Sequence, residues 1–205
     1  MVPLSSDPRG CEGQRRSRFC CPEQQQVPAQ LFPAGGAGLA WAVMASAATP
    51  AIKALTQAGI AHEVLIYHHD PRQRAFGREA VAELAAAGFS AEQIFKTLVI
   101  ALPTGLAVAV LPVPDKLSLK AAAAALGAAR AQMADPAAAQ RSCGYVLGGI
   151  SPLGQRKALP TVIDETALLW DRVLCSAGRR GMDVALSPAD LIRLTGAATA
   201  DICLR

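Results

Sequence analysis

Residues 94–102 read Ile94-Phe95-Lys96-Thr97-Leu98-Val99-Ile100-Ala101-Leu102, and this stretch decides the fold. Its β-branched and apolar residues run up to Pro103 and Gly105, which predicts a buried β-strand. The one charged residue in it is Lys96, and lysine is rarely buried without a partner. Two interpretations are open. Lys96 lies at the strand end and lifts its ammonium group into water, or it is a cation at the mouth of a pocket whose floor is the strand.

The segments on both sides of this strand carry a mixture of helix and strand signals. Pairs of a capping residue and a proline at Thr49-Pro50, Asp135-Pro136 and Ser187-Pro188 predict three helix starts. Further helices are expected at 77–87 and 118–127, and strands at 62–67, 106–113, 132–133, 160–164, 173–176 and 182–186. Strict βαβ alternation is missing, so we expect an α/β protein of the mixed α+β kind, with one domain and helices flanking a mixed sheet.

The composition fits one domain with an extension in front of it. Of the 205 residues 52% are hydrophobic, and the formal charge of +4 permits an anionic partner without demanding one. Residues 1–43 are rich in Gly, Pro, Gln and Arg and have no sustained periodicity, so we expect them to be disordered. Met44 is then the expected true start, and residues 44–205 are the domain.

The cysteines and the apolar stretches bear on the cellular compartment. The six cysteines form no CxxC pair, which favours free thiols in a reducing cytoplasm over a zinc site or a disulfide framework. Arg15-Arg16 ahead of the apolar residues 31–48 resembles a twin-arginine export signal. However, that stretch is broken by proline and glycine and lies well after the arginines, so export is the lesser alternative. We expect a cytoplasmic protein without a membrane segment.

A glycine-rich run at 148–154, Gly-Gly-Ile-Ser-Pro-Leu-Gly, is a second candidate for function. It lacks the spacing of phosphate loops. It predicts either a tight bend between strands or a wall of backbone amides facing a ligand. His68-His69-Asp70 is interpreted as a solvated turn, because adjacent side chains of an extended segment point to opposite sides and do not chelate one metal ion. Cys143 and Cys175 have no local activating base, which favours structural thiols.

Basic residues gather in three loop segments. They are Arg72, Arg74 and Arg78, then Arg156 and Lys157, and then Arg179 and Arg180. Such clusters are usually solvated surface. Three of them around a lysine at a pocket mouth would also suit a nucleic-acid phosphate backbone.

Several motifs in a fixed order give the chain a family resemblance. Over residues 49–202 it resembles the YbaK/ProX family of freestanding aminoacyl-tRNA deacylases, most closely the Cys-tRNA(Pro) deacylase branch. The matching segments span nearly the whole domain: Thr49-Pro50-Ala51, Tyr67 with His69-Asp70-Pro71, Phe95-Lys96-Thr97-Leu98, Met133-Ala134-Asp135-Pro136, Gly144-Tyr145 with residues 148–154, residues 159–164 and residues 176–183. Residues 1–43 lie outside the resemblance.

This resemblance implies a fold, an activity and a site. The fold is a curved, barrel-like mixed sheet. The activity is removal of cysteine wrongly esterified to tRNA(Pro), with Cys-tRNA(Cys) as a further substrate, in trans to prolyl-tRNA synthetase and without a cofactor or metal. The implied catalytic residue is Lys96, and the implied substrate-binding residues are Tyr67, Phe76, Thr97, Gly148, Gly149, Ser151, Ser176 and Asp183. The acceptor end of tRNA is expected to contact Arg72, Arg74, Arg156, Lys157, Arg179 and Arg180.

The chemistry is consistent with the absence of an obvious nucleophile. An aminoacyl ester is already activated, and a cation with backbone N–H donors can stabilise its oxyanion by about 3–4 kcal/mol per well-placed donor. In this family the substrate's own thiol is thought to attack its carbonyl carbon, and attack by water stays open. One alternative is an Ala-tRNA(Pro) deacylase of the same family. The size of the pocket around Tyr67 and Phe76 would distinguish the two activities. Another is a tRNA- or synthetase-binding module without catalysis, which would have no use for Lys96 beside a Gly-Gly turn.

Overall fold

The strand predicted at residues 94–102 forms over that range and lies in the interior of the sheet. In the computed structural model it is β2 (Ile94–Leu102), and it pairs with β3 (Gly105–Pro112) as an antiparallel hairpin. The structure describes residues 49–72 and 76–204, which all belong to the unit Val43–Arg205. The predictions for residues 1–43, for the start at Met44 and for Arg74 lie outside the described residues.

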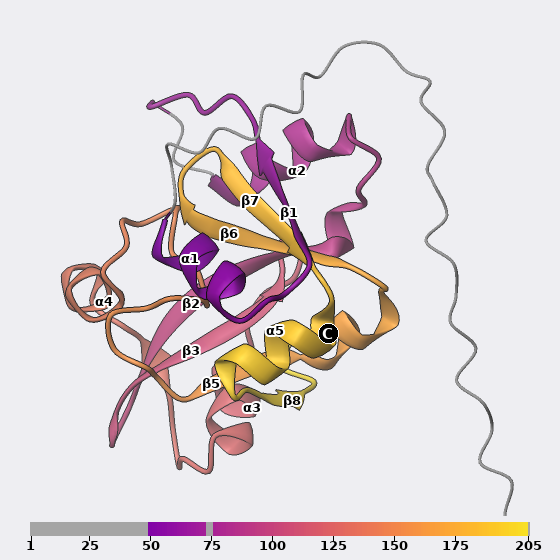
Figure 1. Cartoon of the computed structure of the whole chain (residues 1–205). Coiled ribbons are helices and arrows are strands. Elements are labelled where there is room, and N and C mark those ends of the chain that lie inside the picture. The colour runs from indigo at the N-terminus through magenta and orange to yellow at the C-terminus, as the bar shows by residue number, and fades with distance from the viewer. Residues whose placement is uncertain (1–48, 73–75, 205) are drawn as a thin grey trace, which may run out of the picture. The chain divides into compact units, whose positions relative to one another are not determined.

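Eight strands of the described chain form one mixed sheet (Figure 1). Its order is β1-β7-β6-β2-β3-β5-β8, with β4 added beside β2. The β2/β6, β3/β5 and β5/β8 pairs are parallel, and the β1/β7, β6/β7, β2/β3 and β2/β4 pairs are antiparallel. The remaining strands are β1 (His62–Ile66), β4 (Gln132–Met133), β5 (Thr161–Asp164), β6 (Val173–Arg179), β7 (Met182–Leu186) and β8 (Ala198–Ala200). This arrangement confirms the predicted mixed α/β domain with a curved mixed sheet.

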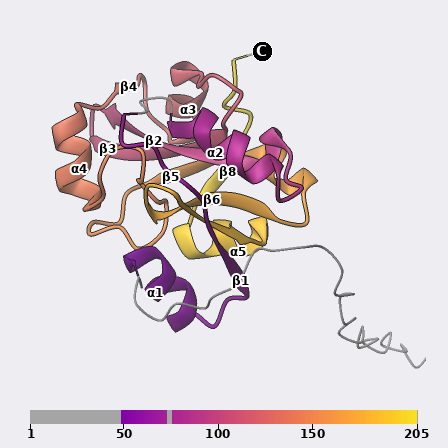
Figure 2. The same ribbon diagram turned by 90° about the horizontal axis from the view of Figure 1, so that it is seen from above.

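Helices cover both faces of the sheet (Figure 2). On one side lie α2 (Phe76–Ala85) and α3 (Leu119–Ala125), and on the other lie α1 (Pro50–Gln57) and α5 (Pro188–Thr195). The other helical elements are α4 (Pro136–Cys143) and the 3₁₀ turns η1 (Ala91–Gln93) and η2 (Glu165–Leu169). Within the described ranges, no helix has the length and apolar character that a membrane span requires.

The helix starts follow the capping signals of the sequence. Thr49 Oγ1 accepts a hydrogen bond from Ile52 N at 3.3 Å, and Asp135 Oδ1 accepts one from Ala138 N at 2.8 Å. The first helical residue is a proline in both cases, where its missing N–H is not needed. The predicted cap at Ser187 makes no such side-chain hydrogen bond, although α5 does begin at Pro188.

Two features of the sheet differ from the predictions. β6 does not end at Ser176. It continues to Arg179 through an irregularity in its pairing with β7, where Gly178 has φ +94°. β8 was not predicted, because its three residues Ala-Thr-Ala carry little apolar signal. They are held by parallel pairing with β5, which is distant in sequence.

The two faces of β2 pack into different parts of the core. Phe95 and Val99 belong to the large cluster on the side of α1 and α5. Ile94 and Ile100 point to the other side, where they join the clusters beneath α2 and α3. Because side chains alternate along a strand, Lys96 shares the face of Ile94 and Ile100, and Thr97 shares the face of Phe95 and Val99.

Candidate active site

Four of the predicted site residues come together in a row across neighbouring strands. Ser176 on β6 pairs directly with Asp183 on β7, and the parallel pair Phe95–Cys175 places Lys96 beside Ser176. Tyr67 follows β1, whose Leu65 pairs with Asp183. The row lies on the face of the sheet that α2 covers, since Leu65, Leu174 and Ala185 on this face pack against Ala80 and Leu84 of α2.

The ammonium group of Lys96 is bound by two backbone carbonyl groups. Its Nζ donates a hydrogen bond to Val113 O at 3.0 Å and another to Asp115 O, both in the segment between β3 and α3. Burial lowers the pKa of Lys96, and the nearby charges of Asp115 and Cys203 oppose this effect. The first turn of α2 lies against the same segment, because a Cβ on Gly77 would approach Val113 Cγ1 to 2.9 Å. The ammonium group is therefore fixed in direction beside the start of α2.

Asp183 is the buried acid of the row. Its exposed fraction is 5%, and its side chain forms no hydrogen bond or ion pair with the residues that the structure describes. Burial raises its pKa to about 7. Tyr67 lies near this buried acid. Its phenol pKa is raised by burial and then by the negative charges of Asp183, Glu79 and Glu83. An acid buried without a partner is costly for stability, and such groups are typical of functional sites.

Cys143 and Cys175 offer no activated thiol at this row. Cys175 is fully buried on the opposite face, in the cluster of Phe95 and Val99. Burial, and then the charge of Asp183, raises the pKa of its thiol well above the ordinary value. Cys143 is buried in the same cluster, where its sulfur contacts the backbone of Tyr145. Both thiols therefore lie in the apolar cluster, away from the row, and the environment of Cys175 disfavours a thiolate nucleophile.

The Gly148-Gly149 segment is a tight turn that touches α2. Gly149 N donates to Val146 O at 3.0 Å, so this amide is used inside the turn and does not face a ligand. Gly148 has φ +79°, and a Cβ there would lie 2.5 Å from the ring of Phe76. Only glycine fits so close to the aromatic ring in this conformation. Gly148 N makes no hydrogen bond within the described residues, and it is the amide of the pair that remains free.

Phe76, the first residue of α2, lies among several functional candidates. The guanidinium carbon of Arg180 is 4.6 Å from the centroid of its ring, and the ring of His69 is 6.1 Å away. His69 is not solvated as predicted. Its side chain is 16% exposed, and Nδ1 lies 2.7 Å from Glu79 Oε2. Sequence reasoning missed this pair, because Glu79 is ten residues further on in the next helix and no local pattern links the two.

Two predicted substrate-binding side chains do not join the row. Thr97 points to the opposite face of β2, where its hydroxyl group is buried without a hydrogen bond among the described residues. Ser151 is fully buried in the loop after the Gly-Gly turn, and its Oγ accepts a hydrogen bond from Leu153 N at 3.2 Å. Ser151 thus stabilises the loop through this hydrogen bond.

Within the described residues, some of the basic side chains are free and one is engaged. Arg72, Arg156, Lys157 and Arg179 are exposed. Arg180 is partly buried, and its Nε donates to Leu147 O at 2.8 Å. In the described part of the chain, no three His, Cys, Asp or Glu side chains are grouped as metal ligands would be.

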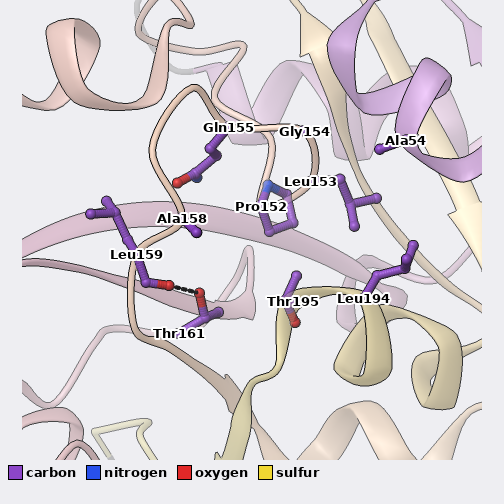
Figure 3. A pocket seen from close by; sticks show the side chains of 10 residues that line it. All are labelled: Ala54, Pro152, Leu153, Gly154, Gln155, Ala158, Leu159, Thr161, Leu194 and Thr195. Atoms are coloured by element: carbon purple, nitrogen blue, oxygen red, sulfur yellow. Dashed lines mark hydrogen bonds between the residues drawn. The ribbon is translucent and has the colours of Figure 1, made fainter.

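A separate pocket of about 160 Å³ (Figure 3) lies beside the core cluster on the side of α1 and α5. Residues of α1, of the loop 152–159 and of α5 line it, among them Leu153, Gln155 and Leu194. Its lining includes no charged residue and none of the predicted site residues. The polar row beneath α2 is therefore the candidate site, and this pocket is not.

The fold and the polar row define a class, a single-domain α/β protein with a fixed lysine, a buried acid and a glycine turn on one face of a mixed sheet. Residues 77–194 match the family described as the aminoacyl-tRNA editing domain. A protein of Enterococcus faecalis, EbsC, is 38% identical over 125 residues, which are 60% of this chain and 75% of that protein. Its provisional name is Cys-tRNA(Pro)/Cys-tRNA(Cys) deacylase.

Solved structures agree with this match. One, described provisionally as a trans-editing enzyme for prolyl-tRNA synthetase, has 26% identity and a TM-score of 0.67, covering 76% of this chain and 96% of the other. Another, of a hypothetical protein, has 24% identity and a TM-score of 0.66, covering 76% of this chain and 100% of the other, and supports the fold. The chain belongs to the aminoacyl-tRNA editing domain family. The predictions of the YbaK-type family and of an aminoacyl-tRNA deacylase are thereby confirmed at the level of the family.

Proposed function

We propose that this protein hydrolyses Cys-tRNA(Pro), and also Cys-tRNA(Cys), by attack of the substrate's own thiol on its ester carbonyl. The observation that carries the proposal is the polar row of Lys96, Ser176, Asp183 and Tyr67 on one face, with Cys143 and Cys175 buried elsewhere. The name of the Enterococcus relative supports cysteine as the amino acid. The similarity to a solved structure described provisionally as a trans-editing enzyme for prolyl-tRNA synthetase supports action beside that synthetase. We place this action in the cytoplasm as part of the proposal.

The charges of the row complement an aminoacyl-tRNA end. Lys96 and Asp183 lie two strands apart, a backbone separation of about 10 Å, so they do not neutralise each other. The substrate brings an α-ammonium group and, in the transition state, an oxyanion on the ester carbonyl. Asp183 would accept the ammonium group, and the third N–H of Lys96 with the free amide of Gly148 would stabilise the oxyanion.

The proposed reaction balances without a protein nucleophile. The thiol sulfur forms a bond to the carbonyl carbon, and the bond from that carbon to the ribose oxygen breaks. The thiol proton ends on the ribose hydroxyl group. The products are free tRNA and a cyclic thioester of cysteine, which water opens to the amino acid. Lys96 acts on the developing charge, and its two carbonyl contacts hold it in place for that role.

A deacylation assay on matched substrates tests the proposal. We expect Cys-tRNA(Pro) and Cys-tRNA(Cys) to be cleaved faster than Ala-tRNA(Pro), and Ser-tRNA(Pro) to be cleaved slowly because its hydroxyl group is a weaker nucleophile. Faster cleavage of Ala-tRNA(Pro) would identify an alanine-specific relative instead. Equal rates for cysteine and serine would indicate attack by water. Binding of tRNA with no cleavage of any of these substrates would leave a non-catalytic module.

A further inference from the structure

Arg180 connects three elements around the proposed site. It follows β6 in the turn to β7, its Nε donates to Leu147 O in the glycine turn at 2.8 Å, and its guanidinium carbon lies 4.6 Å from the ring centroid of Phe76 on α2. One side chain thus contacts both the turn that carries the free Gly148 amide and the aromatic ring that begins α2.

The glycine turn lies so close to Phe76 of α2 and to the turn after β6 that it has no room for a side chain. A Cβ on Gly149 would lie 3.0 Å from Arg179 C and from Arg180 N, and a Cβ on Gly148 would lie 2.5 Å from the Phe76 ring. At such distances a displacement of one element must move the others, because packed groups have no free space between them. The position of the Gly148 amide therefore depends on how Phe76 and Arg180 are held.

The neighbouring Arg179 has a different environment. Its side chain is exposed and forms no hydrogen bond or ion pair within residues 49–72 and 76–204, whereas Arg180 is partly buried and already bound. An exposed arginine with free donors suits a phosphate group. An arginine that donates through Nε and stacks on a ring has its geometry fixed by the protein.

We propose that Arg180 is a positioning residue, which holds the Phe76 ring and the Gly148 amide in their places for deacylation, and that Arg179 supplies the phosphate contact. This inference rests on the proposed function for its role in catalysis. It replaces the expectation that both arginines bind tRNA in the same way. Lysine would not substitute for Arg180, because it lacks both the planar group that stacks on the ring and the Nε–H that reaches Leu147 O.

The first experiment compares Arg180→Ala, Arg180→Lys and the matched control Arg179→Ala. Single-turnover rates at saturating enzyme are measured on whichever of Cys-tRNA(Pro), Cys-tRNA(Cys) and Ala-tRNA(Pro) the wild-type protein cleaves best. We expect both Arg180 variants to lose about tenfold or more in rate with an unchanged salt dependence of tRNA binding, since about 1.4 kcal/mol of transition-state stabilisation is tenfold in rate. Arg179→Ala should weaken tRNA binding and lower the log–log salt slope by about 0.7–0.9. The exposed Arg130→Ala, at a residue outside the site, is the variant expected to keep both the rate and the slope of the wild type.

An unchanged rate for Arg180→Ala, with a salt slope lowered as in Arg179→Ala, would overturn the proposal and make Arg180 a phosphate ligand. Full recovery of the rate in Arg180→Lys would also overturn it, because charge alone would then be sufficient.

A second experiment tests the contact without any substrate. Thermal midpoints are compared for Arg180→Ala, Phe76→Leu and the double variant. We expect the midpoint of the double variant to fall less than the sum of the two single changes, by about 1–4 °C, as expected for a cation–π contact in a domain of this size. Additive midpoints would refute the coupling on which the proposal depends. A further outcome is coupled midpoints in a protein that cleaves none of the three aminoacyl-tRNAs. That result would refute the proposed function and, with it, the role of Arg180 in catalysis. The contact between Arg180 and Phe76 would still stand.

Discussion

Replacing Asp183 by asparagine tests whether the site contains a carboxyl group that weakens the fold at neutral pH. Asp183 is 5% exposed, and its side chain has no hydrogen bond or ion pair within the described part of the chain. Burial raises its pKa from the usual 3.8 to about 7. Asparagine has nearly the same shape and cannot ionise, so the variant removes the charge and little else.

The sign and size of the effect follow from proton binding. Between pH 4 and 7 the folded protein keeps the proton on Asp183 and the unfolded chain does not. The unfolding free energy of the wild type therefore falls as the pH rises through this range, and it levels off above about pH 7. The full difference in pKa corresponds to about 4 kcal/mol, which is an upper limit if water enters the site. About 2–3 kcal/mol of it should develop between pH 5 and pH 8.

Urea unfolding of the wild type and Asp183→Asn at pH 5, 6, 7 and 8 measures this difference, with Asp171→Asn as the exposed control. We expect the stability of Asp183→Asn relative to the wild type to rise by about 2–3 kcal/mol from pH 5 to pH 8, and that of the control to stay level. Deacylation should be impaired in the same variant, because an amide does not bind the substrate's ammonium group as a carboxylate does. Parallel pH curves for wild type and Asp183→Asn would refute the reasoning.

Substitutions at three further residues test the rest of the site. Lys96→Ala should lower the single-turnover rate by about 10²-fold or more and the unfolding free energy by only about 1 kcal/mol. Lys96→Arg should restore little of the rate. A near-normal rate in Lys96→Ala would exclude a catalytic role for Lys96. Gly148→Ala should destabilise the protein by about 1–3 kcal/mol in urea unfolding, since its methyl group would lie 2.5 Å from the Phe76 ring at φ +79°; unchanged stability would show that the turn relaxes freely. Cys175→Ala should keep most of the rate, and loss of activity with an intact fold would point to a protein thiol as nucleophile.

Much of the fold was predictable because its signals are local. The Thr49-Pro50 and Asp135-Pro136 pairs mark helix starts with side-chain caps that the structure contains. The run 94–102 is apolar enough to predict a buried strand on its own. The extension of β6 past Ser176 was missed, because Gly178 favours a turn locally and the strand continues only through its pairing with β7.

The candidate site was predictable only in part, because its contacts are not local. Lys96 and Thr97 were expected in one pocket, yet adjacent residues of a strand face opposite ways, and the structure places them on different faces. An acid in the apolar strand 182–186 was visible in the sequence. The absence of a partner for it in the described chain was not, since that depends on which strands become neighbours.

The strand order explains how the chain assembles a site in which a lysine and a buried acid lie apart from each other. Tyr67, Lys96, Ser176 and Asp183 are spread over more than half of the sequence, and they become neighbours only when β1, β7, β6 and β2 pair in that order. The apolar face of α2, through Ala80 and Leu84, then covers this part of the sheet and excludes water. Exclusion of water is what raises the pKa of Asp183 and lowers that of Lys96. The packing that stabilises the domain therefore also creates the electrostatic strain that a charged substrate would relieve.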